Sequence, residues 1–240
     1  MILNAFPPSK SSLELESGKM ESQAGSHGNG SCITADMEQG SIESYRYYLS
    51  RRTLFQMLSD RGYNVPHSEL TRSLPDFRAF FGQNPDPSRL RICLPLISSP
   101  FKKILVVFCG TDEIRKAVIR LIFQQINREG LHRLILVLQS KMNSHARKVV
   151  DEYPIKVELF QITELLINIT KHVSVPKHEI LSAQEKRKLV NKYKLEDKQF
   201  PIMQKDDAIA RYYGLEKGQV VKITYKGGMT DSLVTYRCVS

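Results

Sequence analysis

The sequence has 240 residues, a hydrophobic share of 41% and a formal net charge of +10 at pH 7. Residues 1–43 contain six acids and two lysines, so the remaining chain carries +14. A basic body of this size favours a polyanionic partner, nucleic acid before a membrane. The chain has no run of about 18 apolar residues and no secretory signal, so we expect a soluble intracellular protein without a membrane partner.

The first predicted segment is a disordered acidic tail over residues 1–42, because Ser, Gly and acids dominate there without an apolar period. A helix is predicted over 44–61, with Gly62 as its stop. Its apolar positions are Tyr45, Tyr48, Leu49, Phe55 and Leu58. A second helix is predicted after Ser73, which supplies an N-cap before Pro75 and Asp76. The expected buried side of this helix consists of Phe77, Phe80 and Phe81.

Strands and helices then alternate. Clean apolar alternation predicts a half-buried strand over 89–97, and continuous apolar runs predict central strands over 102–110 and 133–139. A third strand is predicted over 156–161. Helices are predicted between these strands from Thr111 or Asp112 to Gly130, with Ile114, Val118 and Leu121 inward, and over 144–152; a short helix follows over 163–170. This order implies a layered α/β domain over residues 43–170 with right-handed crossovers.

The composition changes near Lys171, where a small α+β domain over residues 171–240 is predicted. An extended segment held by Pro176 leads to a capping box, Ser182 to Glu185, which begins a helix. Asp206 or Asp207 is expected to cap a short helix that ends at Gly214. Strands are predicted over 220–225 and 232–239. The fold class is therefore mixed α+β, with an N-terminal α/β domain and a small C-terminal α+β domain.

Motifs for catalysis and for small ligands are missing from the sequence. It contains no GxGxxG, GxxxxGK[ST], GxSxG or HExxH pattern. Three carboxylates, Asp76, Asp86 and Glu158, are too separated to form a metal-holding trio with a lysine. The four scattered cysteines lack a CxxC pair, which argues against zinc, and Cys93 and Cys109 are expected to be buried thiols. We therefore predict no catalytic residues, cofactor, metal or small-molecule substrate.

One loop has the composition of a phosphate-binding surface. It follows the strand that ends at residue 139 and precedes a helix N-terminus, whose free amides and dipole favour anions. Such a loop can hold a phosphate backbone without reading base sequence. The alternative is a solvated basic turn. The candidate nucleic-acid-binding residues are Lys141, Asn143, His145, Arg147 and Lys148.

The C-terminal domain carries an aromatic pair, Tyr212 and Tyr213. This pair is interpreted as core plus interface, and base stacking is the less favoured alternative because RNA platforms spread their aromatics over a sheet.

Longer stretches resemble the fifth-largest subunit of nuclear RNA polymerases, a family that also has an archaeal member. The motifs that carry the resemblance are Val-Pro-Lys-His at 175–178, Tyr-Gly-Leu at 213–215 and Gly-Gln-Val-Val-Lys-Ile at 218–223. Met-Leu-Ser-Asp-Arg-Gly-Tyr at 57–63 extends it into the N-terminal half. About 195 residues are covered, and the acidic tail is not.

The resemblance implies a jaw domain that supports downstream double-stranded DNA and an assembly domain that docks on the largest polymerase subunit. It implies a nuclear protein without catalytic residues of its own. The subunit-interface residues that it implies are Pro176, Lys177, His178, Tyr212, Tyr213, Gly214, Val220, Val221 and Lys222.

Departures from the family pattern are similar to those of plant paralogues that serve RNA polymerase V in RNA-directed DNA methylation and gene silencing. The family's Thr-Pro-Ser-Ala jaw loop, for example, is Asn-Ser-His-Ala at 143–146. A shared subunit of RNA polymerase II or IV is the first alternative. A stand-alone nucleic-acid-binding protein or nuclease is the alternative of another class.

Overall fold

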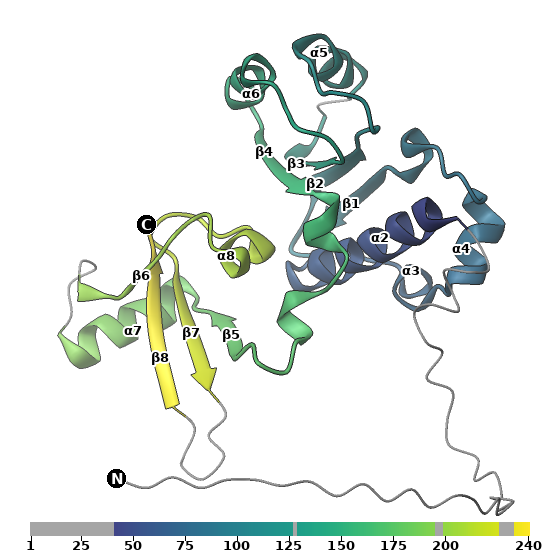
Figure 1. Ribbon diagram of the computed structural model, residues 1–240. Helices are drawn as coiled ribbons and strands as arrows, with labels where there is room; N and C mark the ends of the chain where they lie inside the picture. Colours follow the sequence, from purple (N-terminus) through teal and green to yellow (C-terminus); the bar gives the residue numbers. More distant parts are fainter. Residues whose placement is uncertain (1–40, 127–128, 195–198, 226–232) are drawn as a thin grey trace, which may run out of the picture.

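A computed structural model describes residues 41–126, 129–194, 199–225 and 233–240 of the chain. Two units follow one another, each built on a four-stranded sheet (Figure 1). The predicted tail over 1–42 lies almost wholly outside the described residues. Within the described ranges, no helix is long and apolar enough to cross a bilayer.

The first unit begins with helices that precede its sheet. They are α2 (Ile42–Asp60), α3 (His67–Thr71), α4 (Leu74–Phe81) and the 3-10 helix η1 (Pro87–Leu90). The predicted caps are confirmed for α4, where the Ser73 side chain accepts from the amide of Asp76. The inward side differs at one position, because Phe77 and Phe81 are buried whereas Phe80 is 61% exposed. On α2 the buried tyrosine is Tyr47, and the predicted Tyr45 and Tyr48 are only partly buried.

The first sheet has the order β1-β2-β3-β4. Its strands are β1 (Ile92–Leu96), β2 (Ser99–Phe108), β3 (Leu131–Leu138) and β4 (Lys156–Gln161). β1 and β2 form an antiparallel hairpin, and β2, β3 and β4 run parallel. The crossover helices are α5 (Lys116–Gln125) and α6 (Ser144–Asp151). The predicted α/β layering is therefore present.

Alternating side chains bury both faces of this sheet. Ile104, Val106 and Ile135 pack toward α2, while Leu134 and Leu136 pack toward α5 and α6. Figure 1 shows α5 and α6 on the side of the sheet away from α2. Burial of both faces explains why the central strands read as continuous apolar runs.

Further sequence-based expectations in this unit are wrong. α5 begins after Arg115 rather than at Thr111, because Ile114 forms an isolated parallel bridge with Met142. Its inward side chains are consequently Ile119 and Phe123, and the predicted Val118 and Leu121 are exposed. Residues 163–170 form the short 3-10 helices η2 (Ile162–Leu165) and η3 (Ile169–Lys171) instead of an α-helix. Cys93 is exposed, whereas Cys109 is buried as expected.

The second unit has the strand order β5-β7-β8-β6. Its elements are β5 (Lys177–Ile180), α7 (Ala183–Tyr193), β6 (Ile202–Met203), α8 (Ala208–Tyr213), β7 (Val220–Tyr225) and β8 (Leu233–Val239). The capping box of Ser182 and Glu185 is present at the start of α7. Asp207 caps α8, and Gly214 ends it in the left-handed conformation at φ 62°. These two helix ends confirm the sequence-based prediction.

Candidate functional site

The basic loop predicted to bind nucleic acid lies between β3 and α6, at the carboxyl end of the parallel strands. Asn143 caps α6, since its Oδ1 accepts from the amide of His145 at 3.1 Å. The amide of Asn143 in turn donates to the carbonyl of Ile114 at 3.2 Å. The loop is therefore tied to the neighbouring β2–α5 loop.

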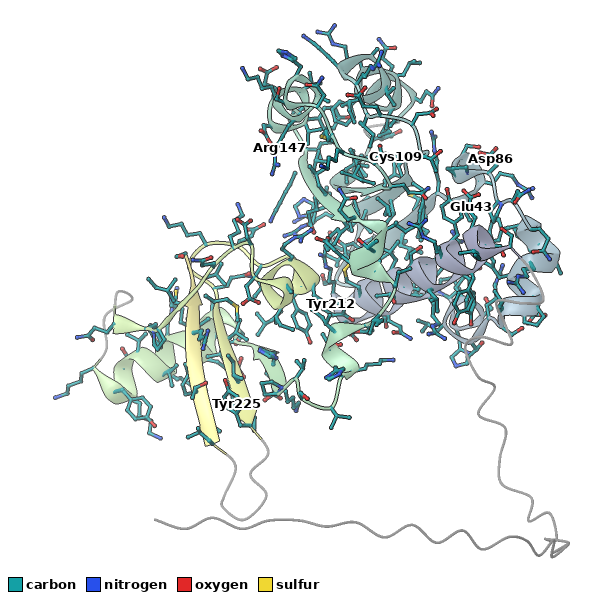
Figure 2. All side chains as sticks on the ribbon, viewed as in Figure 1. Glu43, Asp86, Cys109, Arg147, Tyr212 and Tyr225 are labelled. Atoms are coloured by element: carbon teal, nitrogen blue, oxygen red, sulfur yellow. The ribbon has the colours of Figure 1, made fainter. Side chains whose placement is uncertain are left out.

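Every predicted nucleic-acid-binding side chain of this loop is exposed. The five are Lys141, Asn143, His145, Arg147 and Lys148. Their common loop and α6 place Lys141 and Arg147 on either side of the helix N-terminus in the sequence, and Lys148 follows in the last turn of α6. Figure 2 shows Arg147 on α6 at the side of the first unit that faces α8. This arrangement can contact phosphates through charge and free amides.

A cleft of about 710 Å³ continues from this loop toward the second unit. Lys141 and Arg147 line one side, and Lys205 and Arg211 line the other. Arg211 is committed to the protein, because it pairs with Glu164 at 2.8 Å and donates to the carbonyl of Leu159 at 2.6 Å. Lys205 was missed from sequence because only the tertiary fold brings it opposite the loop.

The C-terminal end of α8 is held by two arginines of the first unit. Arg61 Nε donates to the carbonyl of Tyr212 at 2.8 Å, and Arg61 Nη2 donates to the carbonyl of Arg211 at 2.7 Å. Arg133 Nη1 donates to the carbonyl of Gly214 at 2.9 Å. These carbonyls are the groups that a helix end leaves unpaired, so the first unit caps a helix of the second.

One carboxylate, whose side chain is 12% exposed, joins the two arginines. Glu158 on β4 lies 2.7 Å from Arg61 Nη2 and 3.0 Å from Arg133 Nη1. Burial alone raises the pKa of the Glu158 carboxyl, but the charges and hydrogen bonds of both arginines outweigh burial and hold that pKa below its ordinary value. We call Arg61, Arg133 and Glu158 the arginine clamp.

Several predicted interface residues also make contacts inside the chain. Tyr212 is 4% exposed, and its hydroxyl donates to Asp60 of α2 at 2.7 Å. Figure 2 shows Tyr212 between α8 and α2. Val220 and Val221 are buried in the second sheet, and Gly214 lies against the guanidinium groups of the arginine clamp. Apolar patterning alone does not separate contacts within a chain from contacts between chains.

Tyr213 is partly buried and packs against the cores of both units. Its replacement would therefore act on the joint between the units as well as on any partner. The remaining predicted interface residues stay accessible, with Lys177 exposed and Pro176, His178 and Lys222 partly exposed.

The second sheet presents a polar face away from its core. Strand pairing places Glu179, Lys222 and Tyr236 side by side on this face. A cleft of about 480 Å³ separates them from α7, on which no described side chain is fully buried. We call this surface, with Lys177, Lys222 and Tyr236, the α7 face.

Each of the two units matches a known protein family. The profile of the RNA polymerase Rpb5 N-terminal domain matches residues 41–126, and that of the RNA polymerase Rpb5 C-terminal domain matches residues 167–239. The chain is 53% identical over 209 residues to DNA-directed RNA polymerase V subunit 5C of Arabidopsis thaliana, covering 87% of this chain and 90% of that protein. It is 47% identical over 205 residues to DNA-directed RNA polymerases IV and V subunit 5B of the same plant, covering 85% and 94%.

A more distant relative is subunit RPABC1 of RNA polymerases I, II and III from Caenorhabditis briggsae, which is 37% identical over 210 residues, covering 85% of this chain and all of that protein. These matches and the two units define an accessory, non-catalytic subunit of a DNA-directed RNA polymerase. The chain belongs to the Rpb5 family, and its identity is higher to the Arabidopsis polymerase V-type subunits than to the Caenorhabditis subunit.

Proposed function

We propose that this chain is a nuclear subunit of RNA polymerase V that docks on the largest subunit and supports downstream duplex DNA. The observation that carries the proposal is the 53% identity to polymerase V subunit 5C over 87% of the chain. Participation in RNA-directed DNA methylation follows from that assignment. The exposed basic loop supports the DNA role, and the α7 face supports the docking role.

The proposed DNA contact is tested by removing two cations from the basic loop. In the assembled polymerase, the double variant Lys141→Gln/Arg147→Gln is expected to lower the salt dependence of downstream-duplex binding. Two lost phosphate contacts reduce the slope of log K against log salt by about 2. The measurement is fluorescence anisotropy of a labelled duplex over a salt series.

The matched control is Lys102→Gln/Lys103→Gln, which removes two exposed lysines at the amino end of β2. This control is expected to leave the slope unchanged, since that end of the sheet is opposite to the basic loop. Equal slopes for wild type and both doubles would refute the proposed contact at 141–148.

The proposed docking contact is tested on the α7 face. Tyr236→Ala is expected to weaken binding to the largest subunit about 30-fold, because truncating an aromatic anchor costs about 2 kcal/mol. Tyr225→Ala is the control, since Tyr225 lies on β7 with Val221 and Ile223 on the opposite side of the sheet. Pull-down with the isolated largest subunit measures both. A larger loss of binding for Tyr225→Ala than for Tyr236→Ala would mean that the largest subunit binds the opposite face of the sheet, which would contradict the proposal.

Affinity purification of the tagged chain with mass spectrometry tests which polymerase is served. Recovery of the largest subunit of polymerase V is the expected result. Recovery of the polymerase II or IV largest subunit instead would reassign the chain, and the 47% identity to the subunit named for polymerases IV and V makes polymerase IV the alternative to watch. Recovery without any polymerase subunit would indicate a stand-alone protein.

A further inference from the structure

A small cavity lies beside the arginine clamp, at the amino end of the parallel strands and away from both surfaces described above. Its volume is about 150 Å³, roughly five water volumes at about 30 Å³ each. The lining residues are Arg61, Tyr63, Leu96, His132, Arg133 and Tyr213. A side-chain carboxylate fits this space.

Arg61, one of the lining residues, has a buried donor without an acceptor. The Arg61 side chain is 4% exposed, and its Nε and Nη2 are used by α8 and Glu158. Arg61 Nη1 is buried and has no hydrogen-bond partner among the described residues. A buried polar group that lacks a partner costs about 1–3 kcal/mol, more when it is charged, so an acceptor supplied there would be favourable.

The charge around the cavity favours an anion. Three cations, Arg61, Arg133 and Lys156, pair with two carboxylates, Glu158 and Glu216, which leaves one positive charge uncompensated in this group. His132 is another lining residue, and its pKa is lowered first by burial and then by the charges of Arg133 and Lys102.

An apolar projection adjoins the cavity. The β1–β2 hairpin continues from Leu96, a cavity residue, into a tip on which Ile97 is 67% and Phe101 is 86% exposed. The tip is fixed rather than loose, because the amide of Ile97 donates to the carbonyl of Gly62 at 3.0 Å and Leu96 bridges to Tyr63. Exposed large apolar groups on a fixed projection are typical of a protein-binding site.

We propose that the clamp cavity and the hairpin tip together bind an acidic peptide segment of a partner protein. An Asp or Glu carboxylate of the segment accepts from the donors of the cavity, and a neighbouring apolar side chain packs on Phe101 and Ile97. A protein segment is the proposed occupant because the tip joins an aliphatic side chain, Ile97, to a single aromatic ring, Phe101, whereas sites that bind single strands stack successive bases on several rings. This site is independent of the basic loop and of the α7 face.

Peptide display on the full chain tests the proposal. A library of random dodecapeptides is selected on the wild-type protein and counter-selected on Ile97→Ser/Phe101→Ser. Both side chains are exposed, so the variant is expected to fold, and unchanged thermal unfolding checks this. Val173→Ser is the matched control, because Val173 is fully exposed far from the tip in sequence.

The expected result is a set of peptides that carry Asp or Glu next to an apolar residue. Each is expected to bind the hairpin variant and His132→Glu about tenfold more weakly than wild type, while Val173→Ser binds normally. Exchanging the peptide's Asp or Glu for Asn or Gln should cause a similar loss. The proposal is overturned if no peptide depends on Phe101, if the selected peptides are neutral or basic, or if duplex or single-stranded oligonucleotides displace them.

Discussion

Glu158→Gln is expected to lower the free energy of unfolding by about 3–5 kcal/mol, the range for breaking a buried ion pair by removing one partner. Glu158 is the carboxylate that Arg61 and Arg133 share, so its loss leaves two guanidinium groups facing each other across a neutral amide. Urea-induced unfolding followed by circular dichroism measures the change. A loss below about 1 kcal/mol would mean that the clamp does not hold the two units together.

The control for this variant is Glu216→Gln. Glu216 contacts the same Arg133, at 2.8 Å, but its side chain is largely exposed to solvent. Exposed ion pairs contribute about 0–1 kcal/mol, so this substitution of the same chemistry should have a small effect. The comparison separates loss of a buried carboxylate from loss of a carboxylate near Arg133.

The effect of Glu158→Gln should also depend on pH. Folding lowers the pKa of Glu158, so this carboxylate contributes stability above its unfolded pKa and the contribution is lost as the pH falls through the folded value. The stability gap between wild type and variant is therefore full at pH 7. It narrows as the pH falls below the ordinary glutamate value of 4.5. A gap that widened in acid would contradict the assigned ion pair.

Gly214→Ala is expected to cost about 2–4 kcal/mol, from backbone strain and displaced arginines together. Gly214 has φ 62°, a region that disfavours side chains, and an added Cβ would lie 2.6 Å from Arg133 Nη1 and 3.0 Å from Arg61 Nη1. Long arginine side chains often move easily. Here their hydrogen bonds to Glu158 and to the α8 carbonyls resist displacement, so the clash costs some of those bonds.

Gly218→Ala is the control for Gly214→Ala. Gly218 also has a positive φ, 86°, but an added Cβ there meets nothing within 4 Å. Its replacement carries backbone strain alone, about 1 kcal/mol. Thermal unfolding of both variants distinguishes strain from crowding. Equal losses of stability in the two variants would show that the arginine side chains move away from the added Cβ without a cost in free energy.

Local signals explain which parts of the fold could be predicted from the sequence. Ser73, Ser182 and Asp207 each cap the helix that follows, because a cap needs only a side-chain oxygen and the next few amides. The buried strands were equally accessible through their continuous apolar runs. The start of α5 could not be predicted in this way, since the bridge between Ile114 and Met142 joins residues far apart in sequence.

The arginine clamp could not be predicted either, because its residues are also far apart in the sequence. Arg61 and Glu158 are 97 residues apart, and an isolated charge in a sequence gives no sign of burial. Tyr212 is a similar case, because a tyrosine pair beside a glycine suits either an interface or a core. The basic loop was found because its five residues are close together in the sequence. Its partner across the cleft, Lys205, required the fold.

The arginine clamp binds α8 through its main-chain oxygens, which affects how related sequences can diverge. Because Arg61 and Arg133 hold carbonyl groups rather than side chains, these contacts do not depend on which amino acids occupy α8. Gly214 is restricted by space, and Arg211 and Tyr212 are restricted by their side-chain contacts with Glu164 and Asp60. The main-chain contacts can therefore persist in paralogues whose remaining α8 side chains differ, with the two halves in the same mutual orientation.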